Sequence, residues 1–141
     1  MPHTLLRRSV ANAGPVLSVS TVTDPRPGRV VVEAVGEVDS STAPVLDICL
    51  RSQASQPGVR ELVVDLARVT FLGTAGIEVL VQADRRCRGR GVRLVVRTGG
   101  RRAVLCPLQL TGHPGLVDPH ERGRRPVPEC EEHDVVAAAR Q

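Results

Sequence analysis

Residues 61–80 read ELVVDLARVTFLGTAGIEVL, and this stretch decides the fold. Its beginning is short, apolar and β-branched, which is typical of a buried strand. From Ala75 onward the apolar residues take helical spacing along one stripe: Gly76, Leu80, Ala83 and Cys87. The stretch therefore predicts a strand that turns sharply into a helix, with residues 73–76 exposed at the edge of a sheet.

The hydroxyl group of Thr74 lies at this junction, and two roles for it are open. Threonine commonly caps a helix. A hydroxyl beside a helix N-terminus can also be presented to another protein. A phosphate on Thr74 would add about −1.5 to −2 charges. The helix end would tolerate that charge, whereas a partner surface that buries it unpaired would not.

The chain before this stretch predicts a hairpin and a helix. Residues 16–22 and 29–35 are strand-like, and the Pro- and Gly-containing turn between them predicts an antiparallel pair. Residues 36–44 are rich in hydrogen-bonding side chains, and a helix follows to about Ala54. We expect Thr42 to cap that helix, with Pro44 in its first turn.

The chain after it predicts a further strand at residues 92–96 and a short or broken helix near residues 101–110, limited by Pro107. Helices between strands imply parallel pairing. The fold class is therefore α/β: a single domain with a mixed, mostly parallel sheet of four to five strands and helices, in the order β-β-α-β-α-β-α.

Domain boundaries follow from the loss of periodicity at both ends. We expect a flexible tail over residues 1–15, the domain over residues 16–117, and an irregular Arg- and Pro-rich segment over residues 118–141. That last segment could contain a short helix near residues 129–140, because acidic residues come first and an arginine comes last.

The amino-acid composition bears on the number of domains and on the class of ligand. A length of 141 residues favours one domain. Phe71 is the single aromatic residue, so the stacking platform typical of single-stranded nucleic-acid binding is missing. The net charge is +4 and every basic residue other than histidine is arginine, which fits either anion recognition or a compositional habit of the source genome.

The cysteines and apolar runs indicate a cytoplasmic protein without a cofactor. The four cysteines are widely spaced and never form a Cys-x-x-Cys pair: Cys49, Cys87, Cys106 and Cys130. We expect them to be reduced. No apolar run approaches the ~20 residues of a membrane span, and no signal peptide is recognisable. Cys130-x-x-His133 lacks a second ligand pair, so no metal site is expected. No catalytic arrangement stands out.

Several motifs together resemble the anti-sigma factor antagonists, whose fold is called the STAS domain. Residues 35–39 (VGEVD) and 41–44 (STAP) resemble the end of a family strand and the start of its helix. Residues 64–72 (VDLARVTFL) resemble the strand before the family's phosphorylation loop, and residues 110–116 resemble its late Leu-Thr-Gly-Leu turn. The motifs follow the family's order.

The resemblance implies a phosphorylation switch. The family's loop reads Asp-Ser-Ser/Thr-Gly, and Thr74 occupies the phosphoacceptor position, whereas Gly73 replaces the acidic residue and Ala75 replaces a second hydroxyl residue. The implied partner is an anti-sigma factor of the histidine-kinase-like ATPase type. Binding would release a sigma factor, phosphorylation would prevent binding, and a serine/threonine phosphatase would restore it. The protein itself would not be an enzyme.

Both helix-starting ends of the sheet are expected to form the partner surface, because α/β sheets usually place function there. The expected surface comprises Asp39, Ser40, Ser41, Thr42, Gly73, Thr74, Ala75, Gly76 and Glu78. Asp39 would shape its loop, an Asx turn being compatible with that role. Two alternatives remain: a constitutive, unphosphorylated interaction module, and a nucleic-acid-binding module driven by Arg85 and Arg86.

Overall fold

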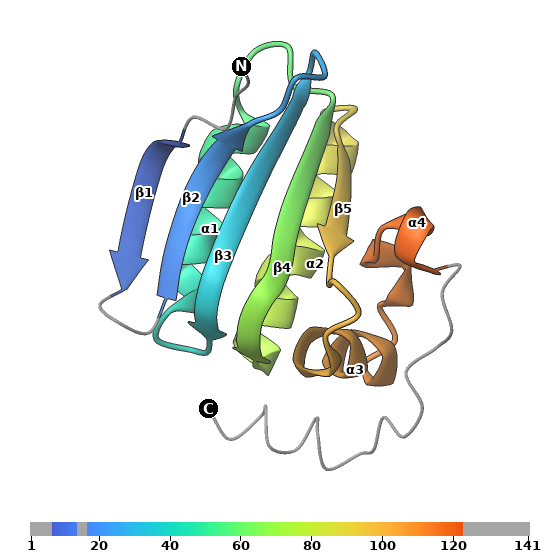
Figure 1. The fold of residues 1–141 in the computed structure, drawn as a ribbon. Helices are drawn as coiled ribbons and strands as arrows, with labels where there is room; N and C mark the ends of the chain where they lie inside the picture. The colour runs from blue at the N-terminus through green and yellow to red at the C-terminus, as the bar shows by residue number, and fades with distance from the viewer. Residues whose placement is uncertain (1–6, 14–16, 123–141) are drawn as a thin grey trace.

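The computed structural model describes residues 7–13 and 17–122 (Figure 1). The elements are, in order, β1 (Arg7–Ala13), β2 (Leu17–Thr23), β3 (Arg29–Val38), α1 (Ala43–Ala54), β4 (Glu61–Leu72), α2 (Thr74–Gly89), β5 (Arg93–Arg97), α3 (Arg102–Leu110), the 3-10 turn η1 (Pro114–Leu116) and α4 (Pro119–Arg122).

The strands form one five-stranded sheet in sequence order. β1, β2 and β3 pair antiparallel, whereas β3, β4 and β5 pair parallel. The hairpin and the parallel pairing of the helix-linked strands are therefore confirmed, as is the mixed α/β sheet. Each helical crossover lets neighbouring strands run in the same direction.

β1 corrects the prediction of a flexible tail over residues 1–15. Arg7–Ala13 forms an edge strand whose backbone pairs antiparallel with β2. Its sequence, RRSVANA, lacks the apolar alternation that signals a half-buried strand. Backbone pairing at a sheet edge requires no such pattern, because every residue supplies the same peptide groups. The rest of the predicted tail lies outside the described residues.

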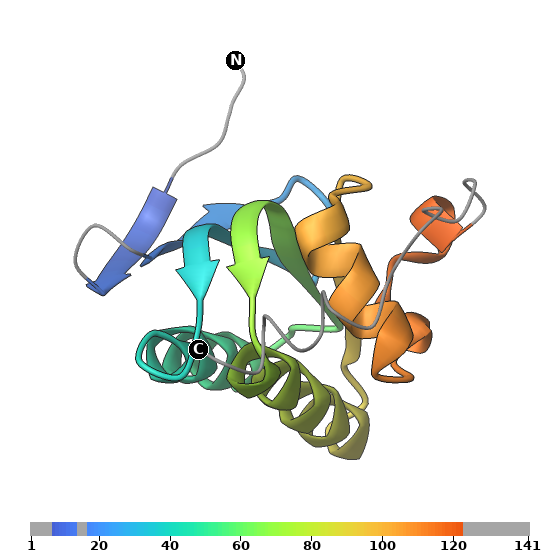
Figure 2. The ribbon, with the colours of Figure 1, turned by 90° about the horizontal axis from the view of Figure 1, so that it is seen from below.

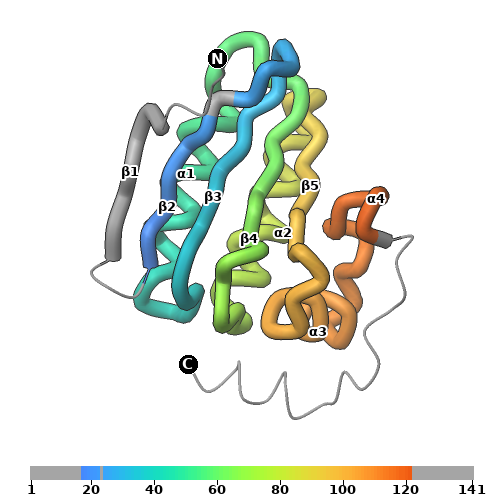
Figure 3. Tube along the Cα trace, in the orientation of Figure 1, coloured from blue at the N-terminus to red at the C-terminus, as the bar shows by residue number. Residues whose placement is uncertain are grey.

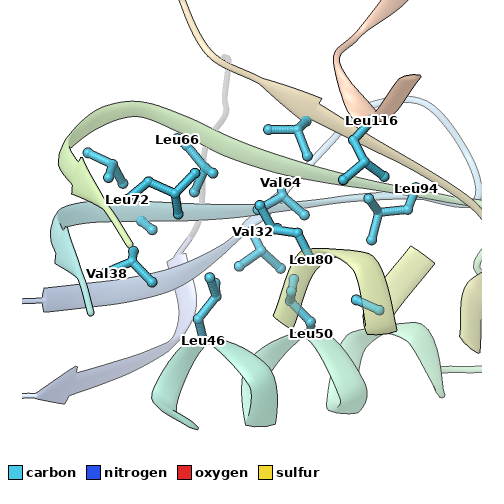
Figure 4. Packing of buried hydrophobic residues seen from close by; sticks show 14 of the residues in the cluster. Val32, Val38, Leu46, Leu50, Val64, Leu66, Leu72, Leu80, Leu94 and Leu116 are labelled. Atoms are coloured by element: carbon cyan, nitrogen blue, oxygen red, sulfur yellow. The ribbon is translucent and has the colours of Figure 1, made fainter. Parts of the chain in front are cut away.

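Helices α1 and α2 pack side by side on one face of the sheet (Figure 2). Leu46 and Leu50 of α1 and Leu80 of α2 point toward Val32 and Val64 of the central strands (Figure 4), and all five side chains are fully buried. Burying one such aliphatic side chain contributes roughly 1.5–3 kcal/mol. The core is thus aliphatic, as the near absence of aromatic residues requires.

Helix α3 lies beside the second half of β4 (Figure 3), because β5 pairs only with residues 61–65 of that strand. The short helix expected near residues 101–110 is present, but the expected break is not: α3 continues through Pro107. Pro107 is buried, so packing offsets the hydrogen bond that its missing N–H removes. Its carbonyl accepts hydrogen bonds from the backbone N–H and hydroxyl groups of Thr111.

The chain remains attached to the sheet beyond residue 117. Val117 bridges to Val96, and the carboxylate of Glu121 accepts hydrogen bonds from the backbone and hydroxyl groups of Thr98 and from the N–H of Gly99, all between 2.8 and 3.1 Å. Part of the segment expected to be irregular is therefore ordered, through α4. The helix predicted near residues 129–140 lies outside the described residues.

The expectation that the cysteines are reduced holds for only some of them. Cys49 and Cys87 carry free thiols, and burial raises the pKa of both. Cys106 on α3 is disulfide-bonded, so the prediction that all the cysteines are reduced was wrong for this residue.

Gly76 provides a direct test of how α2 packs. A Cβ atom at this position would lie 2.6 Å from Cγ1 of Val38 and 2.7 Å from Cδ1 of Leu72. We expect Gly76→Ala to lower the free energy of unfolding by about 1–3 kcal/mol, measured by denaturant titration, because the helix must shift.

The matched control is Gly89→Ala in the same helix, where a Cβ would meet nothing within 4 Å. We expect this variant to gain about 0.4–1 kcal/mol from the lower entropy of the unfolded chain. Equal effects of the two substitutions would contradict the close packing at Gly76.

Candidate functional site

Two loops meet at the edge of the sheet where β3 and β4 end (Figure 1). Parallel strands bring their carboxyl ends to the same edge. Here the two ends are also tied together, because the N–H of Gly73 donates a 2.8 Å hydrogen bond to the carbonyl of Val38. The loop at residues 39–42 and the junction at residues 73–76 therefore lie side by side at the same end of the sheet.

The carboxylate of Asp39 organises the first loop. Its Oδ1 atom accepts hydrogen bonds from the N–H of Ser41 at 2.9 Å, the hydroxyl of Ser41 at 2.7 Å and the N–H of Thr42 at 3.0 Å. These bonds hold the pKa of Asp39 below its usual value, and the hydroxyl of Ser41 makes the largest contribution. Asp39 therefore forms the expected Asx turn and shapes the loop.

Thr42 differs from its expected role. It occupies the N-cap position of α1, and Pro44 lies in the first turn as predicted, but the hydroxyl of Thr42 caps no helical N–H. That hydroxyl donates to the carbonyl of Glu37 and accepts from the N–H of Asp39, both at 2.9 Å. Thr42 is buried and stabilises the loop from within.

Thr74 does not cap α2. Gly73 is the N-cap residue, with an extended backbone, and Thr74 is the first helical residue. Within the described residues no hydrogen bond involves the hydroxyl of Thr74, and its side chain is exposed. The capping interpretation was therefore wrong, and the hydroxyl is free to react or to contact a partner.

A shallow groove of about 280 Å³ joins the two halves of the region between α1 and α2. Its lining comes from both helix starts: Ser40, Ala43, Pro44, Asp47, Ala75, Glu78, Val79 and Gln82. The sequence reasoning included Ser40, Ala75 and Glu78 but missed the others. Helical spacing from Ala75 relates Glu78, Val79 and Gln82, but their meeting with residues of α1 depends on how the two helices pack.

The predicted residues contribute in different ways. Ser40, Ser41, Thr74 and Glu78 are exposed. Three of the nine residues are buried and support the surface rather than form it: Thr42, Gly73 and Gly76. On the outer face of α1, Ile48 is 67% exposed, which the sequence reasoning also missed.

The arginines in the second half of α2 are partly engaged in ion pairs. Arg86 contacts Asp47 of α1 at 2.9 Å, which fastens the two helices together, and Arg88 contacts Asp84 at 3.0 Å. Arg86 therefore has a local partner, and this weakens the alternative that Arg85 and Arg86 drive nucleic-acid binding.

The described residues contain neither a group of metal ligands nor a membrane-spanning helix. No cluster of three or more histidine, cysteine or acidic side chains is placed to hold a metal ion there. The Cys130–His133 pair lies outside that part of the chain. The helices in that part of the chain lack the length and hydrophobicity of a membrane span.

The hydrogen bonds of Asp39 predict a pH-dependent contribution to stability. Because its pKa is lowered in the folded protein, the contribution is complete above the ordinary value of 3.8 and is lost as the pH falls through the lowered pKa. We expect Asp39→Asn to lower the free energy of unfolding by about 1 kcal/mol at neutral pH. That deficit should shrink toward zero in acid, as measured by denaturant titration across pH.

The control for this experiment is Glu37→Gln, which removes a neighbouring exposed carboxylate and leaves the hydrogen bonds of Asp39 in place. An equally large, equally pH-dependent deficit in the control would assign the effect to net charge rather than to the loop.

Comparison with known proteins identifies the family. The family model described as "Mlab, STAS domain" matches residues 21–118. The anti-sigma-F factor antagonist RsfA of Mycobacterium tuberculosis is 32% identical over 94 residues, which cover 64% of this chain and 71% of that protein.

Two solved structures share the fold. An anti-sigma factor antagonist from Mycobacterium paratuberculosis matches with a TM-score of 0.63 and 24% identity, over 93% of this chain and 100% of that one. The antagonist SpoIIAA in its unphosphorylated form matches with a TM-score of 0.61 and 15% identity, over 71% of this chain and 85% of that one. Together with the family model and RsfA, these likenesses show that the chain belongs to the anti-sigma factor antagonists of the STAS domain family.

Proposed function

We propose that this protein binds an anti-sigma factor of the histidine-kinase-like ATPase type and thereby releases a sigma factor. Its binding surface consists of the exposed parts of residues 39–42 and 73–78 with the groove between them. Phosphorylation of Thr74 switches binding off, and a serine/threonine phosphatase restores it. The protein works in the cytoplasm as a binding partner and kinase substrate, not as an enzyme.

The observation that carries this proposal is the state of the Thr74 hydroxyl, which is exposed and forms no hydrogen bond within the described residues. In the transfer, Oγ1 of Thr74 forms a bond to the γ-phosphorus of the partner's ATP. The bond from that phosphorus to the bridging oxygen breaks, ADP leaves, and a base of the partner takes the hydroxyl proton.

A phosphate at Thr74 would change the charge of the groove. It would stand at the N-terminus of α2, where the helix dipole favours a negative charge. It would also lie one turn from Glu78, which lines the groove and has no ion pair within the described part of the chain. A partner surface suited to the neutral hydroxyl would then face two unpaired negative groups, which should abolish binding.

A constitutive binder is the second candidate, and the residues beside Thr74 favour it. Gly73 is buried and supplies no carboxylate, and Ala75 supplies no second hydroxyl at the partly exposed position that follows Thr74. A kinase that reads those groups would not modify this loop. The surface would then bind its partner without regulation.

A capture experiment tests the proposal. Immobilised wild-type protein, Thr74→Glu and the control Ser52→Glu are compared for the proteins they retain from a lysate of the source organism. Ser52 is exposed in the last turn of α1, away from the groove, so its substitution adds the same charge elsewhere. We expect wild type and Ser52→Glu to retain a kinase-like ATPase. The amount of this ATPase retained by Thr74→Glu should be at least about tenfold lower.

The other outcomes are equally informative. Retention of the same ATPase by all three proteins would support the constitutive binder, and preincubation with ATP should then leave capture by wild type unchanged. Retention of no such ATPase by wild type would contradict the proposed partner.

A further inference from the structure

The end of the sheet opposite Thr74 carries exposed arginines. Arg26 lies in the turn between β2 and β3, Arg60 directly precedes β4, Arg90 follows α2, and Arg93 begins β5. All four side chains are exposed. We refer to Arg26, Arg60, Arg90 and Arg93 as the arginine end.

Backbone hydrogen bonds bring these segments together. The N–H of Arg60 donates to the carbonyl of Gly28 at 2.7 Å, and the N–H of Arg93 donates to the carbonyl of Arg60 at 2.9 Å. Figure 1 shows the β2–β3 turn and the starts of β4 and β5 side by side at the top of the sheet. Three segments distant in sequence thus contribute cations to one place.

The carboxylates near this end form ion pairs with other arginines. Asp24 and Glu61 lie 3.7 and 3.1 Å from the guanidinium group of Arg29, and Asp84 lies 3.0 Å from that of Arg88. Within the described residues no carboxylate forms an ion pair with a side chain of the arginine end. Counted over the described part of the chain, this end therefore carries a net positive charge.

We propose that the arginine end is a second docking surface, for an acidic segment of a protein. A guanidinium group binds a carboxylate through two parallel hydrogen bonds, and unpaired exposed arginines have those donors available. The surface lies at the opposite end of the strands from Thr74, so phosphorylation there leaves it accessible. A partner bound at the groove and an acidic segment bound here can occupy the protein together.

Nucleic acid fits this surface less well. Phe71, the single aromatic residue, lies at the far end of β4, so bases find no aromatic ring to stack on near the arginine end. The cations stand on turns and strand starts rather than along one helix that could enter a groove of a duplex.

Fluorescence anisotropy with the full chain tests the inference. The probes are a fluorescein-labelled poly-glutamate peptide and a fluorescein-labelled duplex DNA. We expect the peptide to bind at low salt, to dissociate as sodium chloride is added, and to bind Arg60→Glu about fivefold or more weakly. Thr74→Glu should bind the peptide as wild type does.

The matched control is Arg68→Glu. Arg68 is an exposed residue of β4, lies away from the arginine end and has no ion pair within the described residues, so its substitution changes the net charge equally. Circular dichroism should show both variants folded. Equal weakening of peptide binding by Arg60→Glu and Arg68→Glu would show that binding depends only on net charge. Tighter binding of the duplex than of the peptide would favour nucleic acid as the ligand. Either result overturns the inference.

Discussion

The parallel pairing of β3 with β4 is the constraint on which the rest of the site depends. It brings the ends of two strands together, and the hydrogen bond from Gly73 to Val38 fixes the second junction against the first. Helices α1 and α2 then start from neighbouring points and lie side by side on the same face of the sheet (Figure 2). The groove between them is a direct consequence of this topology.

Different residues stabilise the two halves of the site. In the first loop, the carboxylate of Asp39 and the hydroxyl of Thr42 form hydrogen bonds with backbone N–H and carbonyl groups. The loop is therefore stabilised by its own hydrogen bonds. In the second half, Gly76 lets α2 approach Val38 and Leu72 closely. The exposed hydroxyl of Thr74 therefore stands at the start of a closely packed helix, although no polar contact within the described residues holds the hydroxyl itself.

The sequence predicted those parts of the fold that have a strong local signal. The period change near Ala75 identified the strand-to-helix junction, and the alternation of strands with helices identified the parallel sheet. β1 was missed because a backbone-paired edge strand leaves little mark on side-chain pattern. Pro107 was misjudged because its burial, which no local rule reports, compensates for the lost hydrogen bond. The groove-lining residues Asp47 and Gln82 were missed since they meet only after α1 and α2 pack.

The proposed switch at Thr74 is tested by locating the phosphate on the protein. The captured ATPase is incubated with ATP and the full chain, and the modified residue is identified by fragmentation mass spectrometry. We expect a single phosphate on Thr74, whose hydroxyl is exposed and forms no hydrogen bond within the described residues. A phosphate on Ser40 or Ser41 instead, or the absence of any phosphate while the complex still forms, would contradict the switch at Thr74.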